Sequence, residues 1–411
     1  MNHRALSLIP ITAALFISCN PTTPPANPGP VPPTGEKAIK IAGKLLAPDG
    51  TTPIANALVY VPDSSIATIK AQALACGTPP NATWAATCTG PDGSFSFEAE
   101  TQNSTFKVVF KKGSFEAESQ VNAQNGQANV GNVKLNNDPT KGAPKMAVVT
   151  GSYDRIQNIL AKLGYGQLAN GELKLGTEQF DLFDGDDSLE TSDPSVEALF
   201  TDGNDAGTQA DIFNYDIVFF NCGTQELLTP QDAALLRQYV QGGGKIYASD
   251  LAYDYVEQAF PEHVDFFGSD GTAETVAEEI GMAEVGNEDI ETQATVDGNL
   301  KAWLQTVTCR TGNCVSPDGT VHIEGFAGSW AVINQPHPAK KTEVKVWSSG
   351  NVNWTDNRGD EVVKGSGVKP LSVTFPFGNG KVLYTSYHSE PGTEAGLTPQ
   401  ERILQYLVFE L

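Results

Sequence analysis

The sequence predicts a multidomain protein in which an all-β sandwich precedes an α/β domain that carries a large insertion. Between residues 38 and 136, short runs of alternating apolar and polar residues are separated by turn clusters, a pattern typical of antiparallel strands. From residue 146, apolar strands alternate with helix-like stretches, which indicates a parallel sheet with helices on both faces. With 411 residues, 40% hydrophobic and 18% charged, the chain is long enough for several cores.

The charge balance restricts the partners that this chain can have. It contains 26 Lys and Arg residues against 49 Asp and Glu residues, for a formal net charge of -23. Such a charge repels nucleic acid and anionic lipid head groups, so no nucleic-acid partner is expected. High solubility or attraction of divalent cations fits this charge better.

The N-terminus has the layout of an export signal. Residues 1–18 combine a weakly basic start with an apolar run over residues 5–17, and a small residue stands just before Cys19. The run is too short to span a bilayer as a helix of the mature chain. Its ending, from Phe16 to Cys19, resembles a bacterial lipoprotein signal, which implies that Cys19 becomes the lipidated first residue. A plain secretory signal with an incidental cysteine is the alternative.

A proline-rich segment, residues 19–37, follows the signal. Its central part is free of charge, and such a segment serves as a tether that holds a domain away from a membrane surface. The two segments together predict an exported protein that is lipid-anchored to the bacterial cell envelope. Its partners would be the membrane and an envelope ligand that the sequence does not identify.

Five further cysteines fit an exported chain. Cys76 and Cys88 are close enough in sequence to close a small loop as a disulfide, and so are Cys309 and Cys314. Both pairs lie among Gly, Pro, Asn and Thr residues, and Cys222 is left single. No CxxC pair occurs, so disulfides are expected here rather than a cysteine metal site.

The predicted β-sandwich, residues 38–136, contains two Pro-Asp-Gly turns and alternating strands such as Ser94–Phe97. Its pattern resembles the carboxypeptidase regulatory-like domain, a transthyretin-type sandwich, at Gly43, Pro53–Val61 and Thr89–Phe97. The resemblance implies a non-catalytic spacer or adhesion module.

A polar linker, residues 137–145, leads into the predicted α/β domain, residues 146–411. Apolar runs predict buried strands, a 3.6-residue period predicts helices, and Thr229-Pro230 marks a helix start. The expected elements are the strands Met146–Thr150, Tyr215–Asn221 and Lys245–Ala248 and the helices Tyr153–Leu163 and Thr229–Val240.

This order resembles the class I glutamine amidotransferase-like fold. The segment from Tyr215 to Gly243 is similar to the strand and helix before the central strand of that fold. The segment GNGKVLYTSYHSE, ending at Glu390, is similar to its last strand. The resemblance implies a mainly parallel, flavodoxin-like sheet, interrupted here by an insertion at about residues 256–369.

In catalytic members of that fold, a nucleophile in a tight turn faces a His-x-Glu corner, here His388 and Glu390. The matching turn holds Asp250 where the family has a cysteine, and alanines replace its glycines. Ser249 lies one residue away, and Cys222 ends the preceding strand and could approach His388. Alternatively, Asp250 caps the following helix, and Cys222 is a small buried hydrophobe.

An acidic loop is a second candidate site. Closely spaced carboxylates are what a hard cation such as calcium needs, and a solvated loop is the alternative. The candidate ligands are Asp181, Asp184, Asp186 and Asp187.

Three functions are compatible with these features. The first is a membrane-anchored envelope protein whose amidotransferase-like domain has lost the nucleophile and serves binding or structure. The second is an exported hydrolase that uses His388 and Glu390 with Asp250, Ser249 or Cys222. The third is a cation-dependent adhesion or structural protein. Because Asp250 replaces the cysteine, the sequence favours a protein that is not an enzyme.

Overall fold

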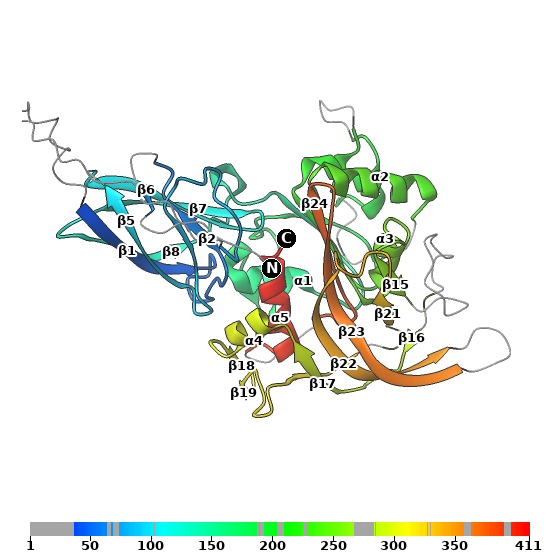
Figure 1. Cartoon of the computed structure of the whole chain (residues 1–411). Coiled ribbons are helices and arrows are strands. Elements are labelled where there is room, and N and C mark those ends of the chain that lie inside the picture. The colour runs from blue at the N-terminus through cyan, green and yellow to red at the C-terminus, as the bar shows by residue number, and fades with distance from the viewer. Residues whose placement is uncertain are drawn as a thin grey trace, which may run out of the picture. The chain divides into compact units, whose positions relative to one another are not determined.

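A computed structural model (Figure 1) describes most of the chain from residue 37 onward. The signal, the tether up to residue 36 and Cys19 lie outside the described residues. Those described are 37–63, 67–68, 74–101, 103–186, 189, 193–203, 209–224, 228–266, 283, 285–326, 328, 330–356, 363–389 and 396–411.

Residues 37–134 form two four-stranded sheets, with the strand orders β3-β5-β1-β8 and β4-β2-β6-β7. Apolar side chains from both sheets join one buried core, where the rings of Phe95 and Phe110 meet at 5.4 Å. Whether this pair of sheets is a carboxypeptidase regulatory-like sandwich stays a prediction. The strands are β1 (Lys37–Leu46), β2 (Leu58–Tyr60), β3 (Ala67–Thr68), β4 (Ala86–Cys88), β5 (Ser94–Thr101), β6 (Thr105–Lys112), β7 (Phe115–Asn122) and β8 (Gln127–Lys134).

A ten-stranded sheet organises the rest of the chain. One half consists of parallel neighbours in the order β12-β9-β13-β14-β24, which is the second-first-third-fourth-fifth order of flavodoxin-like sheets. These strands are β9 (Met146–Val149), β12 (Asp181–Phe183), β13 (Ile217–Phe220), β14 (Lys245–Ser249) and β24 (Gly380–Thr385).

The other half of this sheet is antiparallel, so the prediction of a mainly parallel sheet is wrong for the whole sheet. The predicted insertion supplies about half of β23, which pairs with β24, and the strands β22, β17, β20 and β16 beyond it. These strands could not be placed from the sequence, because the long strands have mixed polarity. The strands are β16 (Val285–Gly286), β17 (Thr292–Val296), β20 (Val321–Ile323), β22 (Lys345–Asp356) and β23 (Val363–Phe377).

Three small pairs of strands lie outside this sheet. They are β10 (Leu168–Ala169) with β11 (Glu172–Leu173), β15 (Val264–Phe266) with β21 (Ile333–Pro336), and β18 (Thr308–Cys309) with β19 (Gly312–Asn313).

Helices cover both faces of the parallel strands, as Figure 1 shows. Along β13, Ile217 and Phe219 face the core that contains α1 and α5, whereas Val218 and Phe220 face the core that contains α2 and α3. The parallel strands have continuous apolar runs because both of their faces are buried. The helices are α1 (Ile156–Leu160), which continues as a π-helical turn (Ala161–Tyr165), α2 (Pro230–Gly242), α3 (Asp254–Glu257), α4 (Gly298–Leu304) and α5 (Pro399–Val408); short 3-10 turns cover Pro139–Lys141, Val196–Phe200, Asp211–Asn214 and Asp250–Tyr253.

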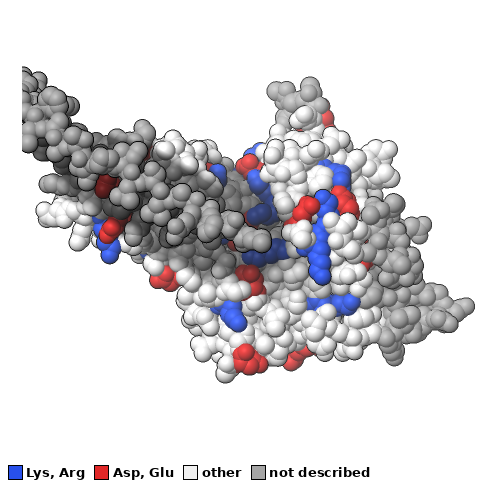
Figure 2. Space-filling view, in the orientation of Figure 1, with Lys and Arg blue, Asp and Glu red and all other residues white. Residues whose placement is uncertain are grey.

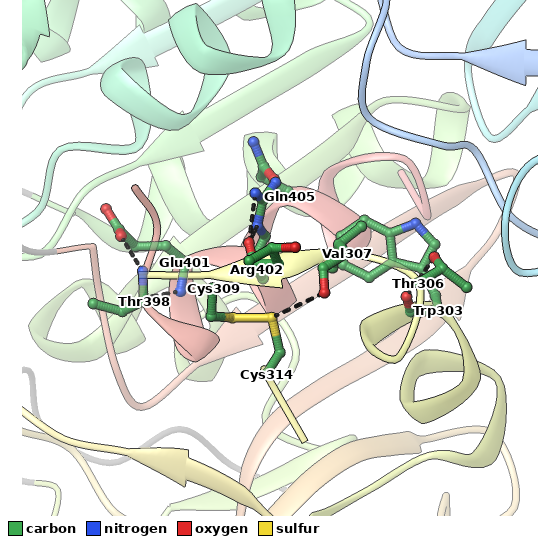
Figure 3. The surroundings of a disulfide bond; sticks show 10 residues. Trp303, Thr306, Val307, Cys309, Cys314, Thr398, Glu401, Arg402 and Gln405 are labelled. Carbon is green, nitrogen blue, oxygen red and sulfur yellow. Dashed lines mark hydrogen bonds between the residues drawn. A yellow bond between two sulfur atoms is a disulfide. The ribbon is translucent and has the colours of Figure 1, made fainter. Parts of the chain in front are cut away.

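Both predicted disulfides are confirmed: Cys76 is bonded to Cys88 and Cys309 to Cys314. The second closes the β18–β19 hairpin beside the start of α5 (Figure 3), where Arg402 donates to the Thr308 carbonyl at 2.8 Å. Cys222 is the free cysteine of the described residues. Two disulfides are compatible with export. Among the described helices, none has the length and apolarity to cross a membrane.

Candidate functional site

The turn after β14 brings Asp250 to the carboxyl edge of the parallel strands. Asp250 has a φ of 48°, a left-handed conformation that a non-glycine residue seldom adopts. The strained turn therefore exists even though alanines flank it. The Asp250 side chain does not cap the following helical turn, because its Oδ1 has no hydrogen-bond partner among the described residues, so the cap interpretation is wrong. Instead, its Oδ2 lies 3.3 Å from Nδ1 of His388.

Three strands bring together Cys222, Asp250 and His388, named here the Cys-Asp-His cluster. Cys222 follows β13, Asp250 follows β14 and His388 follows β24. One potential ligand atom from each lies within 4.8 Å of the others. Cys222 and Asp250 are fully buried, and His388 is 6% exposed. The cluster lies outside the carboxyl ends of parallel strands, where open α/β sheets place ligands.

Burial determines the protonation of the Cys-Asp-His cluster. It raises the pKa of the Cys222 thiol far above its usual value, and the neighbouring Asp250 carboxyl raises it further. Burial also raises the pKa of Asp250, although the contact with His388 opposes this shift. A raised pKa disfavours the thiolate form that a cysteine nucleophile needs.

Ser249 binds Asp154, a carboxylate that the sequence patterns did not single out. Its hydroxyl donates to Oδ2 of Asp154 at 2.5 Å and accepts the Cys222 N–H at 3.0 Å. The prediction of Ser249 as a partner of His388 is therefore not supported by its contacts. Glu390, the predicted orienting residue, lies outside the described part of the chain.

Asp154 is completely buried in the loop after β9. Its Oδ1 accepts the backbone N–H of Ser389 at 3.0 Å and the Ser389 hydroxyl at 2.7 Å. The backbone N–H of Arg155 donates to the same oxygen at 2.7 Å. Asp154 thus ties the loops after β9 and β24 to the last residue of β14. Its signal in the sequence was an acid just after the first apolar strand, within the stretch predicted as helix.

The described carboxylates of the acidic loop are bound by protein donors. Asp181 accepts from the Tyr215 hydroxyl at 2.8 Å, and Asp186 accepts from the Thr150 hydroxyl at 2.8 Å. The same Thr150 hydroxyl lies 3.4 Å from Oδ1 of Asp184. Asp187 lies outside the described residues. Asp181 therefore accepts from a different hydroxyl than Asp184 and Asp186 do. Calcium binding by this loop stays a prediction.

Other places in the described part of the chain also have features of ligand sites. Glu291, His322 and Glu324 form a more exposed acidic cluster around a histidine. A pocket of about 360 Å³ is lined by several lysines, and Figure 2 shows basic side chains gathering on that face. These lysines already have acidic or carbonyl partners: Lys111 with Glu116, Lys112 with Glu410, Lys345 with Asp297 and Lys381 with the Glu410 carbonyl.

No protein-family model matches this chain. No curated protein matches it either. Among solved structures, it is similar to a ThuA-like protein from Bacteroides uniformis, with 12% identity and a TM-score of 0.35 over 65% of this chain and 90% of the other. A cytoplasmic protein from Salmonella typhimurium gives 12% identity and a TM-score of 0.33 over 64% and 98%. A 3-chlorocatechol 1,2-dioxygenase from Rhodococcus opacus has 9% identity and a TM-score of 0.16. The match covers 25% of this chain and 60% of the dioxygenase. At these TM-scores the similarities carry no argument about function.

Proposed function

We propose that this protein is a membrane-anchored component of the bacterial cell envelope whose α/β half binds a ligand at the Cys-Asp-His cluster without nucleophilic catalysis by a thiolate. The observation that carries the proposal is the contact between Asp250 and His388 at the turn where a nucleophile would stand. A carboxyl next to a histidine forms a hydrogen-bonded pair, and the turn then lacks the thiol that a thiolate mechanism needs.

The protonation of Cys222 supports the same conclusion. A catalytic cysteine needs a lowered pKa and an accessible thiolate, and Cys222 has neither property. Ser249 is engaged by Asp154, so its hydroxyl is not held by His388. The α/β half therefore has the loops of a ligand site but lacks an activated thiol or hydroxyl among these residues.

Alkylation of Cys222 tests this proposal. The full-length chain is treated with iodoacetamide near neutral pH, folded and in denaturant, and the peptide that carries Cys222 is quantified by mass spectrometry. We expect alkylation of the folded protein to be slower by roughly two orders of magnitude, because a buried thiol reacts only after opening. Alkylation at the rate of the unfolded chain, or a rate that stays high at mildly acid pH, would reveal a thiolate and refute the proposal.

Membrane anchoring is tested separately through Cys19. Cells that produce the wild-type chain or the Cys19→Ala variant are fractionated, and the protein is followed by immunoblotting. The lipid-anchor proposal expects the wild type in the membrane fraction and the variant in the soluble exported fraction. Equal membrane association of the two would contradict it.

Hydrolysis by an acid–histidine pair is the second candidate, and the 3.3 Å contact between Asp250 and His388 favours it. It requires turnover of an ester, amide or glycoside that is lost in both Asp250→Asn and His388→Gln. Turnover that survives either substitution would exclude this pair as the catalyst.

A further inference from the structure

The Cys-Asp-His cluster has the chemistry of a metal site as well as its position. Sulfur, nitrogen and carboxylate oxygen are the ligands that zinc takes, commonly three from the protein. Metal–ligand bonds of about 2.0–2.3 Å in a tetrahedron place ligand atoms roughly 3.3–3.8 Å apart. The distance of 3.3 Å between His388 Nδ1 and Asp250 Oδ2 fits this geometry.

An unused oxygen of Asp250 is the independent observation that points to a ligand. Oδ1 of Asp250 is buried and has no hydrogen-bond partner in the described part of the chain. A buried carboxylate oxygen without a partner costs free energy, and a bound cation would remove that cost. Cys222 supplies a free thiol beside this carboxyl, since the other described cysteines are all in disulfides.

We propose that Cys222, Asp250 and His388 bind one divalent transition-metal ion of the zinc type. This inference deepens the proposed function, on which it rests, by naming the class of ligand that the cluster takes. A thiolate and an imidazole select such a metal over calcium or magnesium, which prefer oxygen ligands. With three protein ligands, the fourth position of the ion stays open to water or an anionic group of an envelope ligand.

Surrounding hydrogen bonds hold two of the three ligands, Cys222 and Asp250, in place. The Cys222 N–H donates to Ser249, whose hydroxyl donates to the buried Asp154. On the other side, the Tyr384 hydroxyl donates to the Asp250 carbonyl at 2.9 Å. Such outer contacts orient metal ligands and are a usual part of metal sites.

Binding of an ion by the cluster is coupled to proton release. Binding of the ion releases the Cys222 thiol proton to solvent, and the proton of Asp250 where that carboxyl is protonated. The ion then supplies the positive charge that a buried thiolate and carboxylate require. Because protons and metal compete for the same atoms, affinity should fall as the pH falls.

Cobalt(II) titration of the full-length, metal-free chain tests this inference. Cobalt(II) replaces zinc and shows a thiolate-to-metal charge-transfer band. We expect one ion per chain with this band, and Cys222→Ser should abolish the band. Asp250→Asn and His388→Gln should each weaken binding by at least about tenfold, because each removes a ligand. Zinc should displace the cobalt and remove the band.

His322→Gln is the matched control, because His322 belongs to the more exposed acidic cluster. It should leave the stoichiometry and the band unchanged. Circular dichroism shows which variants are folded. If Cys222→Ser is unfolded, the test rests on Asp250→Asn, in which the charge-transfer band should show weaker cobalt binding. Absence of a bound ion, or binding unaffected by all three ligand substitutions, would overturn the inference. If Cys222 is nevertheless protected from alkylation, the proposed function stands without the metal.

Discussion

At the scale of single residues, Asp154 and Ser249 show how the candidate site is held. Asp154 accepts four hydrogen bonds of 3.0 Å or less, from Ser249, Arg155 and both donors of Ser389. Ser249 joins this carboxylate to the backbone of Cys222. A buried carboxylate is tolerable only when donors surround it, so these contacts fix two loops and the end of β14 at once.

Ser249→Ala should destabilise the fold by about 2–4 kcal/mol, because it removes a charge-assisted hydrogen bond and leaves the buried Cys222 N–H without its acceptor. Ser389→Ala is the matched variant: it also removes a hydroxyl from Asp154 but keeps the backbone donor of Ser389. Urea denaturation should therefore show the larger loss for Ser249→Ala. Equal or reversed losses would contradict the role given to the Cys222 N–H.

At the scale of secondary structure, two helices begin with the same device. Thr229 and Thr398 each cap a helix through a capping box, with Asp232 and Glu401 as the reciprocal partners, and a proline follows each cap. The first was readable because Gly242 to Gly244 ended a clear apolar period. The second helix also starts with a Thr-Pro pair. However, α5 is buried on nearly all sides, so the sequence shows no distinct apolar face there.

The two caps differ in burial, and their variants should differ accordingly. Thr229→Ala should cost about 1 kcal/mol, the usual value for an exposed cap. Thr398→Ala should cost more, because Thr398 is 5% exposed and its loss leaves the buried N–H of Glu401 without its acceptor. Thermal unfolding of both variants followed by circular dichroism measures the difference. A Thr398→Ala loss no greater than that of Thr229→Ala would count against this role of burial.

At the scale of the molecule, residues 37–411 form one compact unit. The C-terminus contacts the β7 end of the second four-stranded sheet: the Ser114 N–H donates to the Leu411 carbonyl at 2.8 Å, and the Phe115 and Phe409 rings meet at 4.9 Å. Trp303 also donates to the Pro53 carbonyl at 2.7 Å. These contacts predict that the N-terminal sheets and the α/β half unfold together.

Phe409→Ala should destabilise the whole unit by about 3–5 kcal/mol, the usual cost of deleting a buried aromatic ring. Calorimetry should show one transition that moves to lower temperature. Leu175→Ala is the control, since Leu175 is 59% exposed and its loss should change little. A second transition, with only one part of the unit affected by Phe409→Ala, would show that the sheets and the α/β half unfold independently.

The strands and helices with strong periodic patterns could be predicted from the sequence. Strands β9, β13 and β14 and helix α2 lie where apolar runs and the Thr229 cap indicated, and both disulfides follow the short cysteine spacings. Local signals suffice there because strand period, capping and loop closure act over a few residues. The antiparallel half of the large sheet was not predicted, because β22 and β23 have mixed polarity and because the pairing of β16 and β17 with β22 joins distant segments.

The sequence by itself determined which residues lie at strand ends: Cys222, Asp250 and His388 each follow an apolar strand. Only the tertiary structure decided that these ends are neighbours, that Ser249 serves Asp154, and that Asp250 adopts the left-handed turn instead of capping a helix. The physical reason is that parallel strand order and register bring together side chains separated by more than a hundred residues. Their burial then sets their protonation, which no local pattern of letters encodes.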